Sequence, residues 1–193
     1  ANILGKEKNT KLAVEVMTRL VDQRGYTPQG GVALATLAAV GKDFKLAAKV
    51  IERILDKNPD LLKAQILYAK ILIQSKRKDE ALDWLKTIYD KGDSTFVIKD
   101  TYARMLVDFK KYEEAKTVFQ DILRKNPDNH NTIYALALLS LQTESFDIAY
   151  QHLLVLEKAK FKINEVRFYL GQIADENKEF DEAMRWYKAI SKG

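Results

Sequence analysis

The sequence lacks cysteine altogether and has only two histidines, His130 and His152, among its 193 residues. The absence of cysteine excludes disulfide bonds, thiolate metal sites and cysteine nucleophiles. Two histidines without cysteine also argue against a transition-metal centre. We therefore expect neither a metal nor a cofactor in this protein.

Proline and glycine are scarce, with three and eight residues respectively, so few chain breaks are available. Long apolar runs are missing as well. The longest stretches, at 32–40 and 133–141, are interrupted by threonine or serine and reach less than half of the ~20 residues that cross a membrane. We expect no transmembrane segment in this chain.

Charge of one sign does not accumulate anywhere along the chain. The net charge is +5, from 32 basic and 27 acidic residues. The basic run Lys76-Arg77-Lys78 is followed directly by Asp79-Glu80, as on most solvated helical surfaces. Because aromatic and basic residues form no common block, we do not expect a nucleic-acid partner.

Catalytic motifs are also missing. Gly30-Gly31 lacks the preceding strand and the following Lys-Ser/Thr of a phosphate loop. The carboxylate pairs Glu113-Glu114 and Asp181-Glu182 fit the first turns of helices, where the helix dipole favours acidic side chains. The two histidines fit surface or hydrogen-bonded positions better than the role of a general base. We predict that the protein is not an enzyme and has no small-molecule substrate.

What the sequence does contain is a repeat of 34 residues. An alanine recurs at this interval, a large residue follows each alanine after four positions, and another apolar residue follows after seven. This spacing places all three on one face of an α-helix. The alanines are Ala13, Ala47, Ala81, Ala115, Ala149 and Ala183; the second column is Met17, Ile51, Leu85, Phe119, Leu153 and Tyr187; the third is Leu20, Ile54, Ile88, Ile122, Leu156 and Ile190.

Another helix is predicted in the preceding half of each repeat. Its signature is a large residue followed by a small one, which lets a neighbouring helix approach closely. Pro59 and Pro127 are stop signals after two of the alanine-bearing helices. Thr27-Pro28 predicts an N-cap followed by proline at the first helical position. The large and small pairs are Leu34/Ala35, Tyr68/Ala69, Tyr102/Ala103, Leu136/Ala137 and Leu170/Gly171.

These columns and their period resemble the tetratricopeptide repeat (TPR), a helix–turn–helix unit of 34 residues. The resemblance implies an all-α solenoid, a right-handed superhelix of antiparallel helix pairs. It predicts an N-terminal segment, 1–27, that carries the second helix of a preceding repeat at 8–24. Five repeats then follow in one continuous solenoid, at 28–61, 62–95, 96–129, 130–163 and a truncated 164–193. The early tryptophan of the family is replaced in every repeat, by Gly31, Gln65, Lys99, Ile133 and Arg167.

Three strings resemble a narrower group, the long proteobacterial TPR lipoproteins. Members of that group lie at the outer membrane and face the periplasm, and at least one is an adaptor for a carboxyl-terminal processing protease. The resemblance implies that this chain is an internal fragment of such a protein. The alternative is a cytoplasmic assembly or regulatory module, associated with RNA-containing complexes. The strings are Tyr102-Ala-Arg-Met-Leu-Val-Asp, Ile133-Tyr-Ala-Leu-Ala-Leu-Leu-Ser-Leu-Gln and Arg167-Phe-Tyr-Leu-Gly-Gln-Ile-Ala, with Arg185-Trp-Tyr further on.

In the TPR family the first helix of each repeat lines a concave groove, so the resemblance implies that a protein or peptide partner binds there. Aromatic and arginine residues are favoured as binding anchors. Tyr134 and Phe168 lie one repeat apart and could form an aromatic shelf. The candidate groove residues are Lys63, Lys70, Arg104, Asn131, Tyr134, Phe168 and Gln172.

The last predicted helix would end the solenoid without a polar capping helix, which a solenoid end needs to cover its apolar face. We therefore expect Trp186, Tyr187 and Ile190 to be partly exposed, or to contact a second copy of the chain in a crystal or a homo-oligomer.

Overall fold

The computed structural model describes the backbone of residues 2–24, 27–92 and 94–190, and every regular element in these ranges is an α-helix. The helices form pairs, and we call the first helix of a pair the A helix and the second the B helix. The A helices are α2 (Pro28–Val40), α4 (Leu62–Gln74), α6 (Phe96–Asp108), α8 (His130–Gln142) and α10 (Ile163–Glu176). The B helices are α3 (Phe44–Lys57), α5 (Lys78–Asp90), α7 (Tyr112–Lys125), α9 (Phe146–Lys158) and α11 (Phe180–Lys188). A further helix, α1 (Asn2–Arg24), precedes the first pair.

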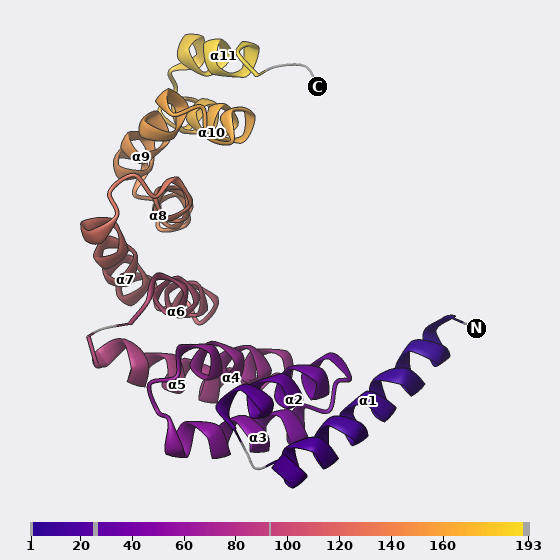
Figure 1. Ribbon diagram of the computed structural model, residues 1–193. Helices are drawn as coiled ribbons and strands as arrows, with labels where there is room; N and C mark the ends of the chain where they lie inside the picture. The colour runs from indigo at the N-terminus through magenta and orange to yellow at the C-terminus, as the bar shows by residue number, and fades with distance from the viewer. Residues whose placement is uncertain (1, 25–26, 93, 191–193) are drawn as a thin grey trace. The chain divides into compact units, whose positions relative to one another are not determined.

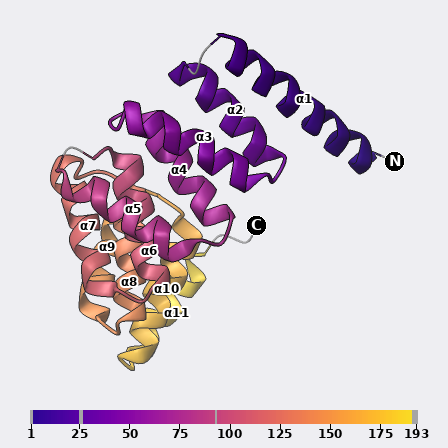
Figure 2. The same cartoon turned by 90° about the horizontal axis from the view of Figure 1, so that it is seen from below.

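The chain divides into two compact units. Unit 1 is Ala1–Asp93 and contains α1 to α5, and unit 2 is Ser94–Gly193 and contains α6 to α11. Within each unit, consecutive helices pack against each other (Figure 1). A second view shows α1 at the edge of unit 1, beside α2 (Figure 2). That the repeats form one continuous solenoid stays a prediction.

The 34-residue period of the sequence is the period of the helices. The B helices begin at residues 44, 78, 112, 146 and 180, at intervals of 34. Because the period is constant, the alanine of each B helix reaches an equivalent site against its A helix. Ala47, Ala81, Ala115, Ala149 and Ala183 are all at most 1% exposed, which confirms the predicted column.

The helix ends follow the capping signals of the sequence. The hydroxyl oxygen of Thr27 accepts a hydrogen bond from the Gly30 backbone N–H at 3.1 Å, and Pro28 occupies the first helical position. α3 and α7 end at Lys57 and Lys125, two residues before a proline, as predicted. The turns between A and B helices were not predicted in detail. Each contains one left-handed residue, with φ between 55° and 64°, and in no case is it glycine: Lys42, Lys76, Lys110, Glu144 and Lys178.

The early tryptophan position of the TPR pattern is filled by a different contact in each repeat. In α2, Gly31 leaves room for Ile54 of α3, because a Cβ on Gly31 would lie only 2.5 Å from Ile54 Cδ1. In α4, Gln65 is buried and its Nε2 donates to the Pro59 carbonyl oxygen at 2.8 Å. The Gln65 carbonyl oxygen in turn accepts from Trp84 Nε1 at 3.4 Å.

The same position carries a positive charge in two repeats of unit 2. The ammonium of Lys99 in α6 donates to Asp121 Oδ2 in α7, and both side chains are largely buried. Arg167 in α10 donates to Glu157 Oε1 at 2.9 Å and to the Ala189 carbonyl oxygen at 2.6 Å. These charges are tolerated at contacts between helices because each meets an anionic or carbonyl partner.

The two end helices differ from the interior ones. Trp186, Tyr187 and Ile190 are partly exposed, as predicted. α1 begins at Asn2, earlier than the predicted 8–24. Among the described residues, no helix combines the length and the apolar character needed to span a membrane.

Candidate binding groove

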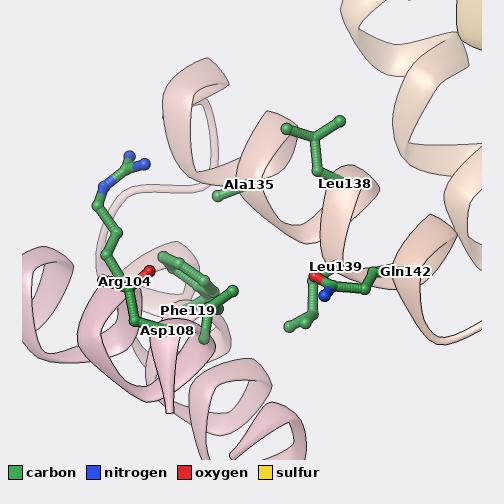
Figure 3. A pocket seen from close by; sticks show the side chains of 8 residues that line it. Arg104, Asp108, Phe119, Ala135, Leu138, Leu139 and Gln142 are labelled. Carbon is green, nitrogen blue, oxygen red and sulfur yellow. The ribbon is translucent and has the colours of Figure 1, made fainter. Parts of the chain in front are cut away.

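Unit 2 contains a pocket between α6 and α8, near the ends of these two A helices, which we call the α6–α8 pocket. Its volume is about 480 Å³. Phe119, which is buried, reaches it from α7. Figure 3 shows Arg104 and Asp108 on one side and Ala135, Leu138, Leu139 and Gln142 on the other. Its lining is Arg104, Val107, Asp108, Phe119, Ala135, Leu138, Leu139 and Gln142.

The polar groups of the α6–α8 pocket lie at its rim and are partly engaged. Arg104 Nε donates to Asp100 Oδ2 at 2.8 Å, and the Arg104 side chain remains more than half exposed. Gln142 Nε2 donates to the Tyr112 hydroxyl oxygen at 2.7 Å. Apart from Arg104, Asp108 and Gln142 the lining is apolar, and the lining residues contain no nucleophile beside a base. The pocket is therefore suited to holding an apolar group next to a charged one, not to acid–base chemistry.

Unit 1 contains the equivalent pocket between α2 and α4, which we call the α2–α4 pocket, with a volume of about 580 Å³. Six of its lining residues lie 68 positions, or two repeats, before a lining residue of the α6–α8 pocket. Its charged lining residues are Lys42 and Lys70. The lining is Thr36, Ala39, Val40, Lys42, Phe44, Leu67, Lys70 and Gln74. The same surface of the helix pair is thus hollowed in both units, but with different charges.

Two of the predicted groove residues line these pockets. Lys70 borders the α2–α4 pocket and Arg104 borders the α6–α8 pocket. Lys63, Asn131 and Gln172 are exposed on α4, α8 and α10, but they do not line either pocket.

The two predicted aromatic residues lie among other aromatic side chains. The Tyr134 hydroxyl donates to Glu165 Oε2 at 3.1 Å, and its ring centroid lies 6.2 Å from that of Phe161. Burial, and then the bond to Glu165, raise the pKa of Tyr134 well above its usual range. The exposed Phe168 ring lies 6.2 Å from the ring of Tyr187. Tyr134 is thus part of the contact between α8 and α10, and the aromatic shelf with Phe168 stays a prediction.

Sequence reasoning placed Leu138 at a groove-facing position, 34 positions after Arg104 and 68 after Lys70, but did not select it as a binding residue. The other apolar walls of the α6–α8 pocket, Val107 and Leu139, resemble ordinary core residues when read singly and were not selected.

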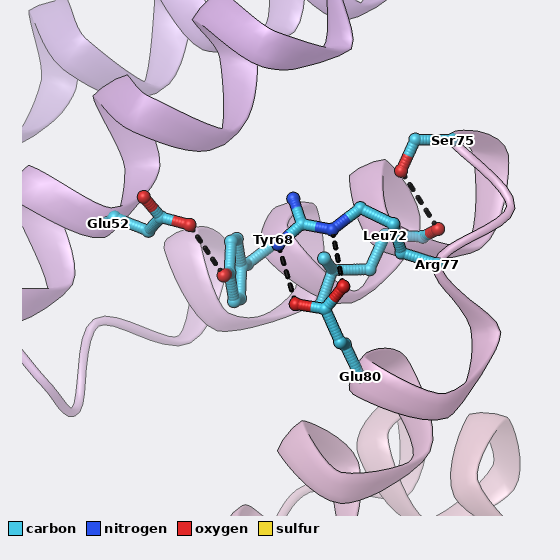
Figure 4. Close-up of polar contacts among 6 residues, drawn as sticks. All are labelled: Glu52, Tyr68, Leu72, Ser75, Arg77 and Glu80. Carbon is cyan, nitrogen blue, oxygen red and sulfur yellow. Dashed lines mark hydrogen bonds and ion pairs between the residues drawn. The ribbon is translucent and has the colours of Figure 1, made fainter.

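A polar cluster in unit 1 has a structural role instead. The Tyr68 hydroxyl donates to Glu52 Oε1 at 2.7 Å, and the Arg77 guanidinium donates to both carboxylate oxygens of Glu80 at 2.6 and 2.7 Å (Figure 4). Burial, followed by the bond to Glu52, raises the pKa of Tyr68 to about 12. The Tyr68 ring also meets the edge of Trp84, with centroids 5.0 Å apart. These contacts join α3, α4 and α5.

Known proteins share this architecture. The family model described as "Anaphase-promoting complex, cyclosome, subunit 3" matches residues 40–122. The MamA crystal structure shares 14% identity with the chain at a TM-score of 0.73, over 83% of this chain and 88% of that one. YrrB, described as a TPR protein with an unusual peptide-binding site, shares 12% identity at a TM-score of 0.70, over 90% of this chain and 89% of that one.

The fold is the tetratricopeptide repeat. A tetratricopeptide repeat protein from Parabacteroides merdae agrees, with 16% identity at a TM-score of 0.75 over 86% of this chain and 66% of that one. No curated protein sequence matches the chain. The predicted all-α class of TPR helix pairs is therefore confirmed. TPR folds are generally scaffolds for protein–protein interaction, because stacked helix pairs offer an extended binding surface.

Proposed function

We propose that this TPR chain is a non-enzymatic scaffold that binds an extended segment of a partner protein along its A helices. An apolar side chain of that segment would enter the α6–α8 pocket. The observation that carries the proposal is the recurrence of one pocket at the same helical positions in both units. A TPR protein of similar fold, YrrB, is described as having a peptide-binding site.

The chemistry of the pocket defines the partner segment. Phe119, Leu138 and Leu139 offer apolar contact, and full burial of a leucine or phenylalanine side chain contributes about 1.5–3 kcal/mol. Arg104 at the rim can donate to a carboxylate, and charge-assisted hydrogen bonds are stronger than neutral ones. We therefore expect an aspartate or glutamate near the apolar residue of the segment. Because the pocket is formed by helices, little ordering is required on binding.

Further groove contacts follow from the sequence predictions. Asn131 and Gln172 are exposed on A helices of unit 2 and would contact the segment outside the α6–α8 pocket. Lys63 is exposed on α4 of unit 1 and would contact a segment bound at the α2–α4 pocket. In the α2–α4 pocket Thr36 stands at the position of Arg104, and Lys70 supplies the cation from the opposite wall, at the position of Leu138. Tyr134 and Phe168 would contact the segment at the α10 end of the groove.

The test is a peptide selection followed by matched variants. Peptides are selected from a displayed library on the wild-type chain, and their dissociation constants are measured by fluorescence polarisation. We expect Leu138→Asp to weaken binding at least tenfold, because it places a charge in the apolar pocket. Val155→Asp, at an exposed position on the B helix α9, is the control and should leave binding unchanged. Equal effects of both variants would refute binding in the groove.

The narrower lipoprotein resemblance makes a finer prediction. It would place the scaffold at the periplasmic face of the outer membrane, where it would present its bound segment to a carboxyl-terminal processing protease. The support for this is the set of short strings in α6, α8 and α10. Faster cleavage of a captured protein by a purified processing protease, lost in Leu138→Asp, would support the adaptor role. Unchanged cleavage would remove it and leave the scaffold role intact.

A further inference from the structure

The helix α1 presents an apolar stripe to solvent. Leu12, Val16 and Leu20 follow one another at intervals of four and are 59%, 50% and 40% exposed. In the next B helix, 34 residues later, Val50 and Ile54 are each only 2% exposed. Leu46, at the position of Leu12, is partly buried. These positions of the repeat are therefore covered in a complete helix pair and open in α1.

One flank of the stripe packs against the core of unit 1. Val14 and Met17 pack against the core of unit 1, and Val21 is buried in it. α1 packs against α2, and it lies at the edge of the unit (Figure 2). Leu37 of α2 joins the stripe to form a shallow apolar groove along α1. A partner helix could therefore lie on the stripe without displacing α2.

Exposed charges of alternating sign follow the other flank of the stripe. They are Lys11, Glu15, Arg19 and Asp22, in the order plus, minus, plus, minus. At about 100° per residue, all four lie on the side of Val16 away from Ala13 and Met17. Glu15 and Arg19 pair within the helix, with 2.7 Å between the carboxylate and the guanidinium.

This order of charges is complementary to itself when two helices run antiparallel. Centred on Val16, an antiparallel pair sets Leu12 against the partner's Leu20. The same alignment sets Glu15 near the partner's Arg19, whereas Lys11 and Asp22 lie further round the helix from the stripe. In a parallel pair the charged flank would face the partner's other flank, which carries Ala13 and Met17, so these charges would have no opposite charge to meet. The charges therefore select both the partner and its direction.

We propose that α1 is a homodimer interface, in which the apolar stripe packs antiparallel against the α1 stripe of a second copy. This interface is separate from the groove and from the C-terminal helix predicted above.

The test uses two charge-reversal variants. Each alone should weaken association of the chain, and a mixture of the two should restore it. Because a single helix pair buries less than a standard interface of about 1,600 Å², association is measured by sedimentation at about 10–200 µM. We expect a wild-type dimer, and at least tenfold weaker association for Glu15→Lys or Arg19→Glu alone. An equimolar mixture of the two variants should form heterodimers, because each then offers the charge that the other lacks. Lys45→Glu on α3 is the control for net charge, and circular dichroism confirms helix content.

Two results would overturn the proposal. One is a monomeric wild-type chain over the whole concentration range. The other is a mixture that associates no better than the single variants. Since the chain has no cysteine, direction can be read independently. Val16→Cys should crosslink on oxidation and Leu12→Cys should not, because Leu12 would face the partner's Leu20; equal crosslinking would refute the antiparallel arrangement.

Discussion

The ion pair between Lys99 and Asp121 gives the sharpest test of the packing within a repeat. The two side chains are 5% and 19% exposed, and the pair joins α6 to α7. Arg124 also contacts Asp121, with 3.0 Å between Nη2 and Oδ1. The hydrogen bond from Lys99, with added attraction from both cations, holds the pKa of Asp121 below its usual range. The two partners are therefore not equivalent: Asp121 has a second cation and some solvent, whereas Lys99 is almost fully enclosed.

This asymmetry predicts different costs for removing each partner. Breaking a buried ion pair by removing one member typically costs about 3–5 kcal/mol, because a charge stays buried without compensation. Asp121→Asn keeps the shape and an acceptor oxygen, so we expect a loss of about 3 kcal/mol in the free energy of unfolding. Lys99→Met removes the buried charge itself and keeps a side chain of similar length. We expect this second variant to change the free energy of unfolding by about 1 kcal/mol or less.

Urea unfolding, monitored by circular dichroism, measures both free energies of unfolding. Repeating the measurement at low pH tests whether the ionised Asp121 is responsible. Because the folded pKa of Asp121 is lowered, its stabilisation is complete above the unfolded value of about 3.9 and is lost as pH falls through the folded pKa. The gap between wild type and Asp121→Asn should therefore be full at neutral pH and shrink below about pH 4. Equal losses for Asp121→Asn and Lys99→Met, or a gap that does not change in acid, would refute this reasoning.

Three further substitutions test other parts of the fold. Ala115→Leu should overpack the contact between α6 and α7 and lower the free energy of unfolding by about 1–3 kcal/mol; a neutral result in urea unfolding would contradict the alanine column. Gly171→Ala should destabilise α11 by a similar ~1–3 kcal/mol, because its Cβ would lie 2.4 Å from the Tyr187 ring; thermal melting of the last helix pair measures this. Lys110→Gly should raise the free energy of unfolding by roughly 0.5–1 kcal/mol, because a left-handed residue with φ of 58° favours glycine; a destabilised variant would show that the Lys110 side chain contributes contacts.

The helices and their core were predictable from the sequence because one period fixes both. Ala47 and Ala81 are buried at equivalent sites since the spacing repeats without an insertion. The turns were less predictable. Lys42 and Lys110 adopt left-handed backbone conformations in which glycine would be expected, so composition gave no signal there.

The candidate groove was predictable as a surface but not as a pocket. Lys70 and Arg104 were selected because they lie at groove-facing positions of A helices, and both line a pocket. The depth of the pocket depends on Phe119, which reaches it from a neighbouring helix. The contact of Tyr134 with Glu165 depends on how α8 and α10 pack, which a single-helix pattern does not specify.

The residue at the early tryptophan position differs from repeat to repeat, and this affects which helices can pair when the chain refolds. An array of near-identical hairpins is prone to mispairing, in which an A helix docks on the B helix of another repeat. Lys99 in place of Gly31 would bury an ammonium against Ile54, and Arg167 there would lose its carbonyl and carboxylate acceptors. Docking of α6 or α10 on α3 is thus penalised, and these contacts favour the pairing of each helix with its own neighbours in sequence.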